Sequence, residues 1–235
     1  MAQRLRKQTD MQIKVYTADV SKLEDIELFM HLYSRVSEDR RVKTDRMVFG
    51  KDKRLSLGAG ALLEAALAAE GVSDFTMTTE HNKKPRLAHS DEIKFNISHS
   101  GTKVMCAISD HNIGCDVEQI ISIDMEIAKR FFFVEEYDAL MRCRDSESRN
   151  DLFFRYWTLK ESFMKATGLG FELALDGFSI ILDGADIFVR QNVDGRSFYF
   201  HEYLLNDGYK YAVCSEEKPE LPTDIIRYDY VRGLK

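Results

Sequence analysis

The chain has 235 residues, of which 44% are apolar, so it is long enough to bury the core of one large domain or of two small ones. A formal net charge of -6 argues against a general nucleic-acid-binding protein, and no apolar run approaches the roughly 20 residues of a membrane span. The four cysteines have no CxxC spacing, which indicates reduced thiols rather than a metal site or a disulfide framework. These features predict a soluble, cytoplasmic protein.

The first elements predicted along the chain are a strand and a helix. Residues 13–20 alternate between apolar and polar side chains, as a strand does, and residues 21–36 have a helical period. Ser21 is the expected N-cap of this helix, and Glu24 would complete a capping box. Residues 1–10 are basic, and no apolar signal-peptide segment follows them. We expect these ten residues to be an extension outside the fold.

Basic residues are concentrated between residues 40 and 54 of the sequence. This segment has two interpretations, a solvated charged helix or a cluster that binds phosphate. An Ala- and Leu-rich helix is predicted to follow over residues 55–71 and to end at Gly71. Residues 75–88 then read as a short strand followed by a turn at Lys84 and Pro85.

A strand-like region from residue 95 to residue 119 carries two carboxylates on one face. Side chains of a strand alternate between faces, so Asp116 and Glu118 point to the same side, with their Cα atoms about 7 Å apart. Two adjacent carboxylates repel, and proteins keep such a pair where a proton is shared or a hard cation binds. The alternative is the solvated outer face of an edge strand.

The second half is predicted to contain a pair of helices, a polar linker, a longer helix and several strands. Residues 121–145 read as two helical pieces, residues 142–149 as the linker, and residues from 178 onward as an antiparallel meander. The longer helix, residues 151–167, has a core stripe of Leu152, Tyr156, Leu159, Phe163 and Ala166.

The opposite face of this helix combines aromatic and charged side chains. Glu161 and Lys165 have the spacing of an ordinary surface ion pair, which explains these two residues without any site. That pairing does not explain Phe154 and Trp157 on the same face. The aromatics indicate either a partly buried cleft or a second packing surface under another element.

Three separated motifs, FNISHSG at 95–101, IGCDVEQ at 113–119 and WTLKESFMKATGLGF at 157–171, resemble the signature of the 4'-phosphopantetheinyl transferases. In length and spacing the chain is similar to the large single-chain type, and the likeness extends loosely from residue 11 to residue 214. The resemblance implies an α/β (α+β) fold of two similar halves related by a pseudo-twofold. Each half would pack a largely antiparallel sheet against helices, with the ligand cleft between the halves. We divide the chain into residues 1–10, 11–114 and 115–235.

The resemblance implies a Mg2+-dependent reaction, with Mn2+ as an alternative metal. The 4'-phosphopantetheine arm of coenzyme A would pass to a serine of an apo acyl or peptidyl carrier protein, releasing adenosine 3',5'-bisphosphate. Asp116, Glu118 and Glu161 are the expected metal ligands. Lys165 would neutralise a phosphate, Lys160 would assist near the attacking or leaving oxygen, and Glu161 would be the base. A metal-bound water acting through Glu161, or Glu118 itself, stays open as the base.

The resemblance also implies the residues that hold coenzyme A. The 3'-phosphate would contact Arg40, Lys43 and Ser56, although the family commonly has lysine where Arg40 stands, and Ser56 could instead cap a helix. Lys84 would approach the coenzyme phosphates from a turn whose usual glycine is replaced by Lys83. The other expected phosphate contacts are Ser98, His99 and Lys165, with a structural role as the alternative for His99.

The acidic carrier protein expected from the resemblance needs a local basic or apolar docking surface, because the chain itself is acidic. Residues 131–133, three consecutive phenylalanines, are the candidate, and the alternative is a helix end buried between the halves. We expect a monomer without nucleic-acid or membrane partners. Two other functions remain open, a metal-dependent nucleotide phosphohydrolase and a non-catalytic module that binds coenzyme A or a carrier protein.

Overall fold

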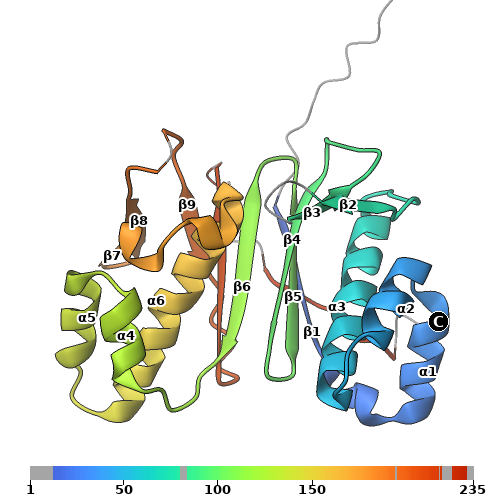
Figure 1. The fold of residues 1–235 in the computed structure, drawn as a ribbon, viewed down its shortest axis with the longest axis horizontal. Helices are drawn as coiled ribbons and strands as arrows, with labels where there is room; N and C mark the ends of the chain where they lie inside the picture. Colours follow the sequence, from blue (N-terminus) through green and yellow to red (C-terminus); the bar gives the residue numbers. More distant parts are fainter. Residues whose placement is uncertain (1–12, 80–83, 194, 217, 219–223, 232–235) are drawn as a thin grey trace, which may run out of the picture.

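The computed structural model describes residues 13–79, 84–193, 195–216, 218 and 224–231 (Figure 1). The extension predicted for residues 1–10 lies outside this range. The first part of the chain forms β1 Lys14–Asp19, a 3-10 helix Val20–Glu24, α1 Ile26–Arg35, α2 Glu38–Asp45, α3 Gly50–Ala69, β2 Met77–Thr79, β3 Pro85–Leu87, β4 Lys94–Ser100 and β5 Lys103–Ser109. The remainder forms β6 Ile113–Gln119, α4 Met125–Phe131, α5 Val134–Met141, α6 Ser146–Thr167, two short 3-10 helices at Gly170–Glu172 and Leu175–Gly177, β7 Ser179–Asp183, β8 Asp186–Arg190, β9 Tyr199–Glu202, β10 Tyr209–Ser215 and β11 Ile226–Arg227. This mixture of helices and mainly antiparallel strands confirms the predicted fold class.

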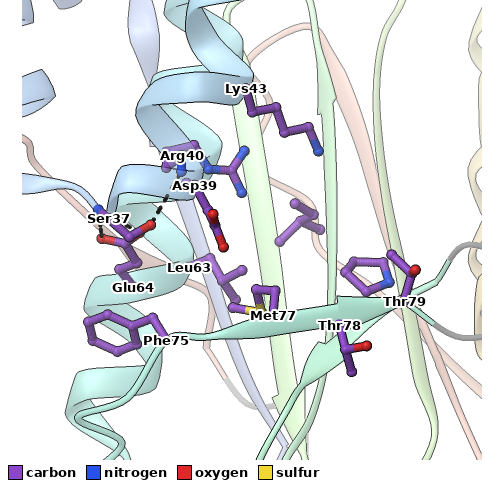
Figure 2. Close-up of a pocket in the computed structure, with 13 residues that line it drawn as sticks. Ser37, Asp39, Arg40, Lys43, Leu63, Glu64, Phe75, Met77, Thr78 and Thr79 are labelled. Carbon is purple, nitrogen blue, oxygen red and sulfur yellow. Dashed lines mark hydrogen bonds between the residues drawn. The ribbon is translucent and has the colours of Figure 1, made fainter.

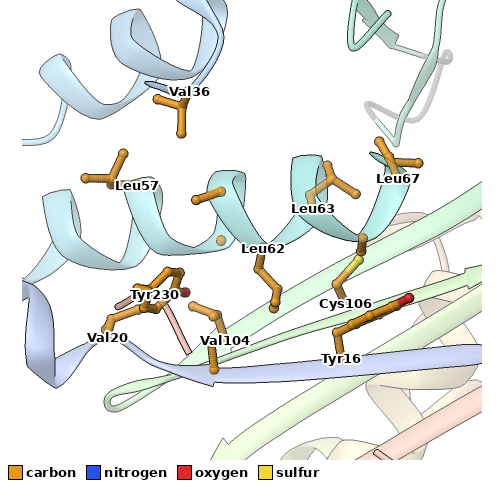
Figure 3. Packing of buried hydrophobic residues seen from close by; sticks show 14 of the residues in the cluster. Tyr16, Val20, Val36, Leu57, Leu62, Leu63, Leu67, Val104, Cys106 and Tyr230 are labelled. Carbon is orange, nitrogen blue, oxygen red and sulfur yellow. The ribbon is translucent and has the colours of Figure 1, made fainter. Parts of the chain in front are cut away.

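Two sheets meet in the middle of the molecule, and helices cover their outer faces (Figure 1). The first sheet has the strand order β11-β1-β5-β4 and packs against α3, while the second has the order β6-β10-β9 and packs against α6. Alternation along each strand therefore serves two cores. On β5, Val104 and Cys106 face α3 (Figure 3), whereas Met105 and Ala107 face the second sheet and pack with Val117.

The end of the described chain completes the first sheet. β11 pairs in parallel with β1, although the other strand pairs of the two sheets are antiparallel. Tyr230, just beyond β11, is buried beside Val20 and Gly58 in the core under α3. The predicted boundary between residues 114 and 115 falls inside β6. The last described residues thus pack on the half of the molecule that contains the first ones.

Helix starts differ most from the predictions. The predicted cap Ser21 is wrong, because Ser21 lies in a 3-10 turn and Asp25 caps α1 by accepting the amides of Glu27 and Leu28. Part of the basic segment forms α2, and α3 begins at Gly50 rather than at residue 55. α6 begins at Ser146, so residues 146–149 are helical rather than part of a linker.

Other boundaries follow the sequence closely. The two helical pieces predicted for residues 121–145 are α4 and α5. α6 ends at Thr167 and is capped by Gly168, whose φ of 78° lies in the left-handed region. The single meander predicted from residue 178 onward is wrong, because β7 and β8 form their own hairpin sheet whereas β9 and β10 join β6. Within the described part of the chain, no helix has both the length and the apolar character needed to cross a bilayer.

Candidate active site

The site is built where β4 of the first sheet meets β6 of the second. These two strands belong to different sheets and are joined by side chains. The hydroxyl of Ser98 donates to Oδ1 of Asp116 at 2.6 Å, and the hydroxyl of Ser100 donates to Oε2 of Glu118 at 2.6 Å. Alternate residues of one strand therefore hold the two carboxylates of the other, on the shared face that the sequence predicts.

Helix α6 brings a cation to the same carboxylate. Lys165 Nζ lies 2.6 Å from Oδ1 of Asp116 and 3.1 Å from Oγ of Ser98. This approach depends on Gly114, because a Cβ atom there would overlap the Ser162 carbonyl and the backbone of α6. The missing side chain lets α6 lie directly on β6, which places Lys165 against Asp116.

The two carboxylate oxygens of Asp116 differ in their surroundings within the described structure. The residue is 2% exposed, and its Oδ2 atom is buried with no hydrogen-bond partner among the described residues. A buried carboxylate oxygen without a donor or a cation is unfavourable, and such an atom marks a place where a ligand is expected. Oxygen atoms of this kind are the ligands that hard divalent cations prefer.

Burial and the charge of Asp116 both raise the pKa values of the neighbouring carboxyls. Burial raises the pKa of Glu118 to about 7, and the charge of Asp116 contributes to the rise. Burial also raises the pKa of Glu161, with Asp116 adding to the effect and Lys165 opposing it. The described residues contain no group of three His, Cys, Asp or Glu side chains arranged around a common metal position. The chemistry of the donors nevertheless fits a divalent cation, since it would relieve their repulsion and satisfy Oδ2 of Asp116.

Four of the residues predicted to hold coenzyme A line one cavity. Arg40, Lys43, Ser56 and His99 surround a cavity of about 160 Å3 between α2, α3 and β4. Arg40 and Lys43 also line a neighbouring cavity of about 190 Å3, which extends to the β2–β3 hairpin (Figure 2). The structure thus brings together Arg40 and His99, which are 59 positions apart in the chain.

The electrostatics of this first cavity favour an anion. Burial lowers the pKa of Lys43, and so does the positive charge of Arg40. Burial also lowers the pKa of His99, as do the positive charges of Lys165 and Lys43. A lowered pKa in a basic group means that its charged form lacks stabilisation. A bound phosphate would supply it.

Ser56 and Lys84 have roles that the sequence did not reveal. Ser56 lies inside α3 with its hydroxyl 3.2 Å from that of Thr44, so the alternative role as a helix cap is wrong. Lys84 Nζ donates to the carbonyl oxygens of Ile113 at 3.1 Å and of Lys165 at 2.8 Å, which ties β3 to β6 and α6. The replacement at Lys83 lies outside the described residues.

Lys160 is not brought together with the three carboxylates. Its side chain is fully buried in the core of the second half, where Nζ lies 2.9 Å from Glu136 Oε1 and donates to the Phe178 carbonyl at 2.7 Å. The same ammonium group lies 4.2 Å from the centroid of the Phe178 ring. This position is that of an anchor between α6, α5 and β7 rather than of a group that contacts a ligand.

The aromatic face of α6 is a second packing surface. Trp157 packs on Phe153 and Phe132, with ring centroids 5.7 Å and 6.3 Å away. Phe132 is 5% exposed, and Phe131 and Phe133 are half-buried. The predicted alternative of a buried helix end therefore holds for Phe132, which is buried within the second half rather than between the halves.

Three further site residues were missed by the sequence analysis. Ser100 donates a hydrogen bond to Glu118, and Asn96 accepts one from the backbone amide of Cys115 at 2.9 Å. Gly114 has no side chain and so lets α6 pack closely on β6. The two polar residues share the strand alternation of Ser98 in the FNISHS segment, and Gly114 shares the face of Asp116. That alternation was the signal by which they could have been found.

Comparisons with known proteins agree with this geometry. Residues 112–214 match the 4'-phosphopantetheinyl transferase superfamily. The 4'-phosphopantetheinyl transferase Sfp of Bacillus subtilis is 35% identical over 211 residues, covering 88% of this chain and 92% of its own. The 4'-phosphopantetheinyl transferase gsp of Aneurinibacillus migulanus is 31% identical over 192 residues, covering 81% of each chain.

A solved structure, the holo-[acyl-carrier-protein] synthase of Thermotoga maritima, overlaps 44% of this chain and 61% of its own with a TM-score of 0.37 and 21% identity. That overlap is too loose to support any conclusion. The sequence relatives are decisive, because they span nearly the whole chain at more than 30% identity. The chain therefore belongs to the 4'-phosphopantetheinyl transferase superfamily.

Proposed function

We propose that this protein transfers the 4'-phosphopantetheine arm of coenzyme A to a serine hydroxyl of an apo acyl or peptidyl carrier protein. The observation that carries the proposal is the buried Asp116, which has one oxygen on Lys165 and the other without a hydrogen-bond partner among the described residues. Next to it lie the basic residues of the cavity formed by α2, α3 and β4. A metal-dependent attack on a pyrophosphate needs both features, and the family of the chain performs this transfer.

Coenzyme A would bind along the basic cavity. Arg40, Lys43, Ser56 and His99 are proposed to hold phosphate groups there, because burial and the charge of Arg40 destabilise the ammonium form of Lys43, which a bound phosphate would stabilise. Lys165 would neutralise charge on the phosphate next to Asp116. We also propose that Ser98 and Lys84 shape this end of the site, Ser98 by orienting Asp116 and Lys84 by fixing the end of α6.

A divalent cation, Mg2+ or Mn2+, would be held by Asp116, Glu118 and Glu161. Bound there, it would supply positive charge to the oxygens of the pyrophosphate as the bond between the two phosphates breaks. Until it binds, burial keeps the pKa values of Glu118 and Glu161 raised, and the charge of Asp116 adds to the rise. The carboxylates would therefore release protons as the cation binds.

The transfer forms a bond between the serine oxygen and the phosphorus that bears the pantetheine arm, and it breaks the bond from that phosphorus to the bridging oxygen. Adenosine 3',5'-bisphosphate leaves with the electron pair of the broken bond. The serine proton goes to a carboxylate, for which we propose Glu161, which lies one helical turn before Lys165 on α6. We revise the role of Lys160, which acts by anchoring α6 through Glu136.

We further propose that the protein works as a monomer in the cytoplasm, without nucleic-acid or membrane partners. Both halves that form the site belong to one chain, so no second copy is needed to complete it. The carrier protein would approach from the side on which the cavity opens.

The proposal is tested by intact-mass spectrometry of a panel of apo carrier proteins incubated with the protein, coenzyme A and Mg2+. We expect at least one carrier to gain a single phosphopantetheine group, and we expect EDTA to abolish the gain. Coenzyme A that binds in a parallel titration but modifies no carrier would indicate a binding module instead. Cleavage of coenzyme A without carrier modification would indicate a phosphohydrolase.

A further inference from the structure

Arg40 lies flat on helix α3, over a residue that has no side chain. A Cβ atom placed on Gly60 would overlap Cγ, Cδ and Nε of Arg40, and the three nearest atoms to that position all belong to Arg40. The guanidinium then reaches one turn back along α3, where Nη1 donates to the Ser56 carbonyl at 3.3 Å. Figure 2 shows Arg40 extending from α2 toward the cavity beside α3. The Arg40 side chain thus occupies the space that a side chain at position 60 would fill.

Glycine inside α3 needs an explanation of this kind. It is the least favourable helix-interior residue apart from proline, and α3 otherwise consists largely of alanine and leucine between residues 55 and 69. Gly58, two residues earlier, is explained by packing, because a side chain there would overlap Val20 and Tyr230. At Gly60 the nearest neighbour is the Arg40 side chain instead, so the space is used by a charged group that lines both cavities.

The chemistry of arginine explains why the space matters. A guanidinium is broader than an ammonium group and donates in a fixed plane, so its side chain needs room where it crosses α3. Arg40 is largely buried, which lowers the pKa of its guanidinium, and Ser56 is the acceptor that the described residues provide for it. The room that Gly60 leaves on α3 keeps the guanidinium at the junction of the two cavities.

We infer that Gly60 is a specificity-determining residue, which seats Arg40 so that the enzyme prefers 3'-phosphorylated coenzyme A over 3'-dephospho-coenzyme A. The inference rests on the proposed function, in which Arg40 holds a phosphate of coenzyme A, here the 3'-phosphate that the family resemblance implies. It assigns to Gly60 a role through Arg40 and no contact with the coenzyme. The expected loss from removing one charge-assisted hydrogen bond is about tenfold in that preference.

The test is a double-mutant cycle of wild type, Gly60→Ala, Arg40→Ala and the double variant, with Gly50→Ala as control. Gly50 lies in the same helix and has room for a methyl group, its nearest neighbour being Arg54 at 3.5 Å. The readout is kcat/KM for coenzyme A divided by kcat/KM for the dephospho form, with one carrier protein throughout. A general structural disturbance would lower both values and leave their ratio unchanged.

We expect Gly60→Ala and Arg40→Ala each to lower the ratio about tenfold, with Gly50→Ala unchanged. The double variant should match Arg40→Ala, because the overlapping atoms are gone in that background. A ratio unchanged by Arg40→Ala would refute the phosphate role of Arg40. A ratio lowered by Arg40→Ala but not by Gly60→Ala would overturn the inference about Gly60. A double variant that shows the combined losses of both single variants would overturn it as well. If Gly60→Ala alone does not fold, the double variant must fold, and its failure to do so would equally overturn the inference.

Discussion

The buried pair of Lys160 and Glu136 offers the sharpest distinction between a structural and a catalytic role. The two side chains are 0% and 1% exposed and lie 2.9 Å apart. Glu136 also accepts the amides of Phe133 at 2.8 Å and of Ile180 at 2.7 Å, so this single carboxylate links α5, β7 and α6. We predict that breaking the pair destabilises the fold and leaves the chemistry nearly intact.

The size of the effect follows from burial. Lys160→Met would leave the Glu136 carboxylate buried without its cation, and Glu136→Gln would leave the ammonium without its anion. Each change should lower the free energy of unfolding by about 3–5 kcal/mol. The double variant removes both charges, keeps an oxygen acceptor at position 136 and should be less destabilised than the sum of the two single changes, with a coupling of about 3 kcal/mol.

The assay is urea unfolding followed by the fluorescence of Trp157, the sole tryptophan, which packs in the same cluster as Lys160. Turnover is then measured where all variants are folded. The double variant should keep kcat within a few-fold of wild type. A double variant that is folded under the assay conditions but has a kcat more than about a hundredfold lower would show that Lys160 acts in catalysis and would refute the reasoning.

Glu161→Gln should fold normally and lower kcat about 100- to 10,000-fold, as expected for loss of a general base, and steady-state kinetics that match wild type would remove Glu161 from the mechanism. Glu118 holds its proton up to a pKa of about 7 in the folded protein but releases it near 4.5 when unfolded, so its ionisation weakens the fold as pH rises through that interval. In EDTA, thermal melts from pH 4.5 to 8 should therefore show wild type losing stability relative to Glu118→Gln, by at most about 3 kcal/mol, and parallel pH curves would contradict this. Gly114→Ala should cost about 1–3 kcal/mol in thermal denaturation and lower kcat by moving α6 from β6, and an unchanged kcat would show that this contact does not position Lys165.

Strand alternation made part of the site predictable. Because the period of a strand is two residues, the shared face of Asp116 and Glu118 followed from the sequence, and the structure places both on the serines of β4. The i,i+4 spacing likewise places Glu161 and Lys165 on one side of α6. What alternation could not predict is that Ser98 and Ser100 come from a different sheet, because pairing between sheets is set by packing over the whole chain.

Helical periodicity was less informative for α6. The sequence pattern has one obvious apolar stripe, but the helix packs on β6 and β10 and also contacts α5 and β7, so most of its circumference is buried. Lys160 therefore lies in a core that no stripe of apolar residues marks. The identity of its partner, Glu136, depends on where α5 docks, which is a tertiary contact across 24 positions of sequence, from 136 to 160.

The residue that caps α1 was also determined by the structure around it rather than by residue type. Ser21 and Asp25 are both acceptable helix caps by type, and the 3-10 turn that starts at Val20 places the second of them at the start of α1. The relation between Arg40 and Gly60 is of the same nature. It is a steric fit between two helices, and nothing in the composition of either segment indicates it.

The central claim is that the cluster around Asp116 transfers phosphopantetheine to a carrier protein. It is tested most directly by measuring carrier modification and adenosine 3',5'-bisphosphate release in the same reaction, for wild type and Asp116→Asn. The account predicts equal amounts of the two products for wild type, and for a folded Asp116→Asn variant a rate lower by on the order of a hundredfold or more. An Asp116→Asn variant that modifies the carrier at the wild-type rate would contradict the account, as would release of the bisphosphate without modified carrier.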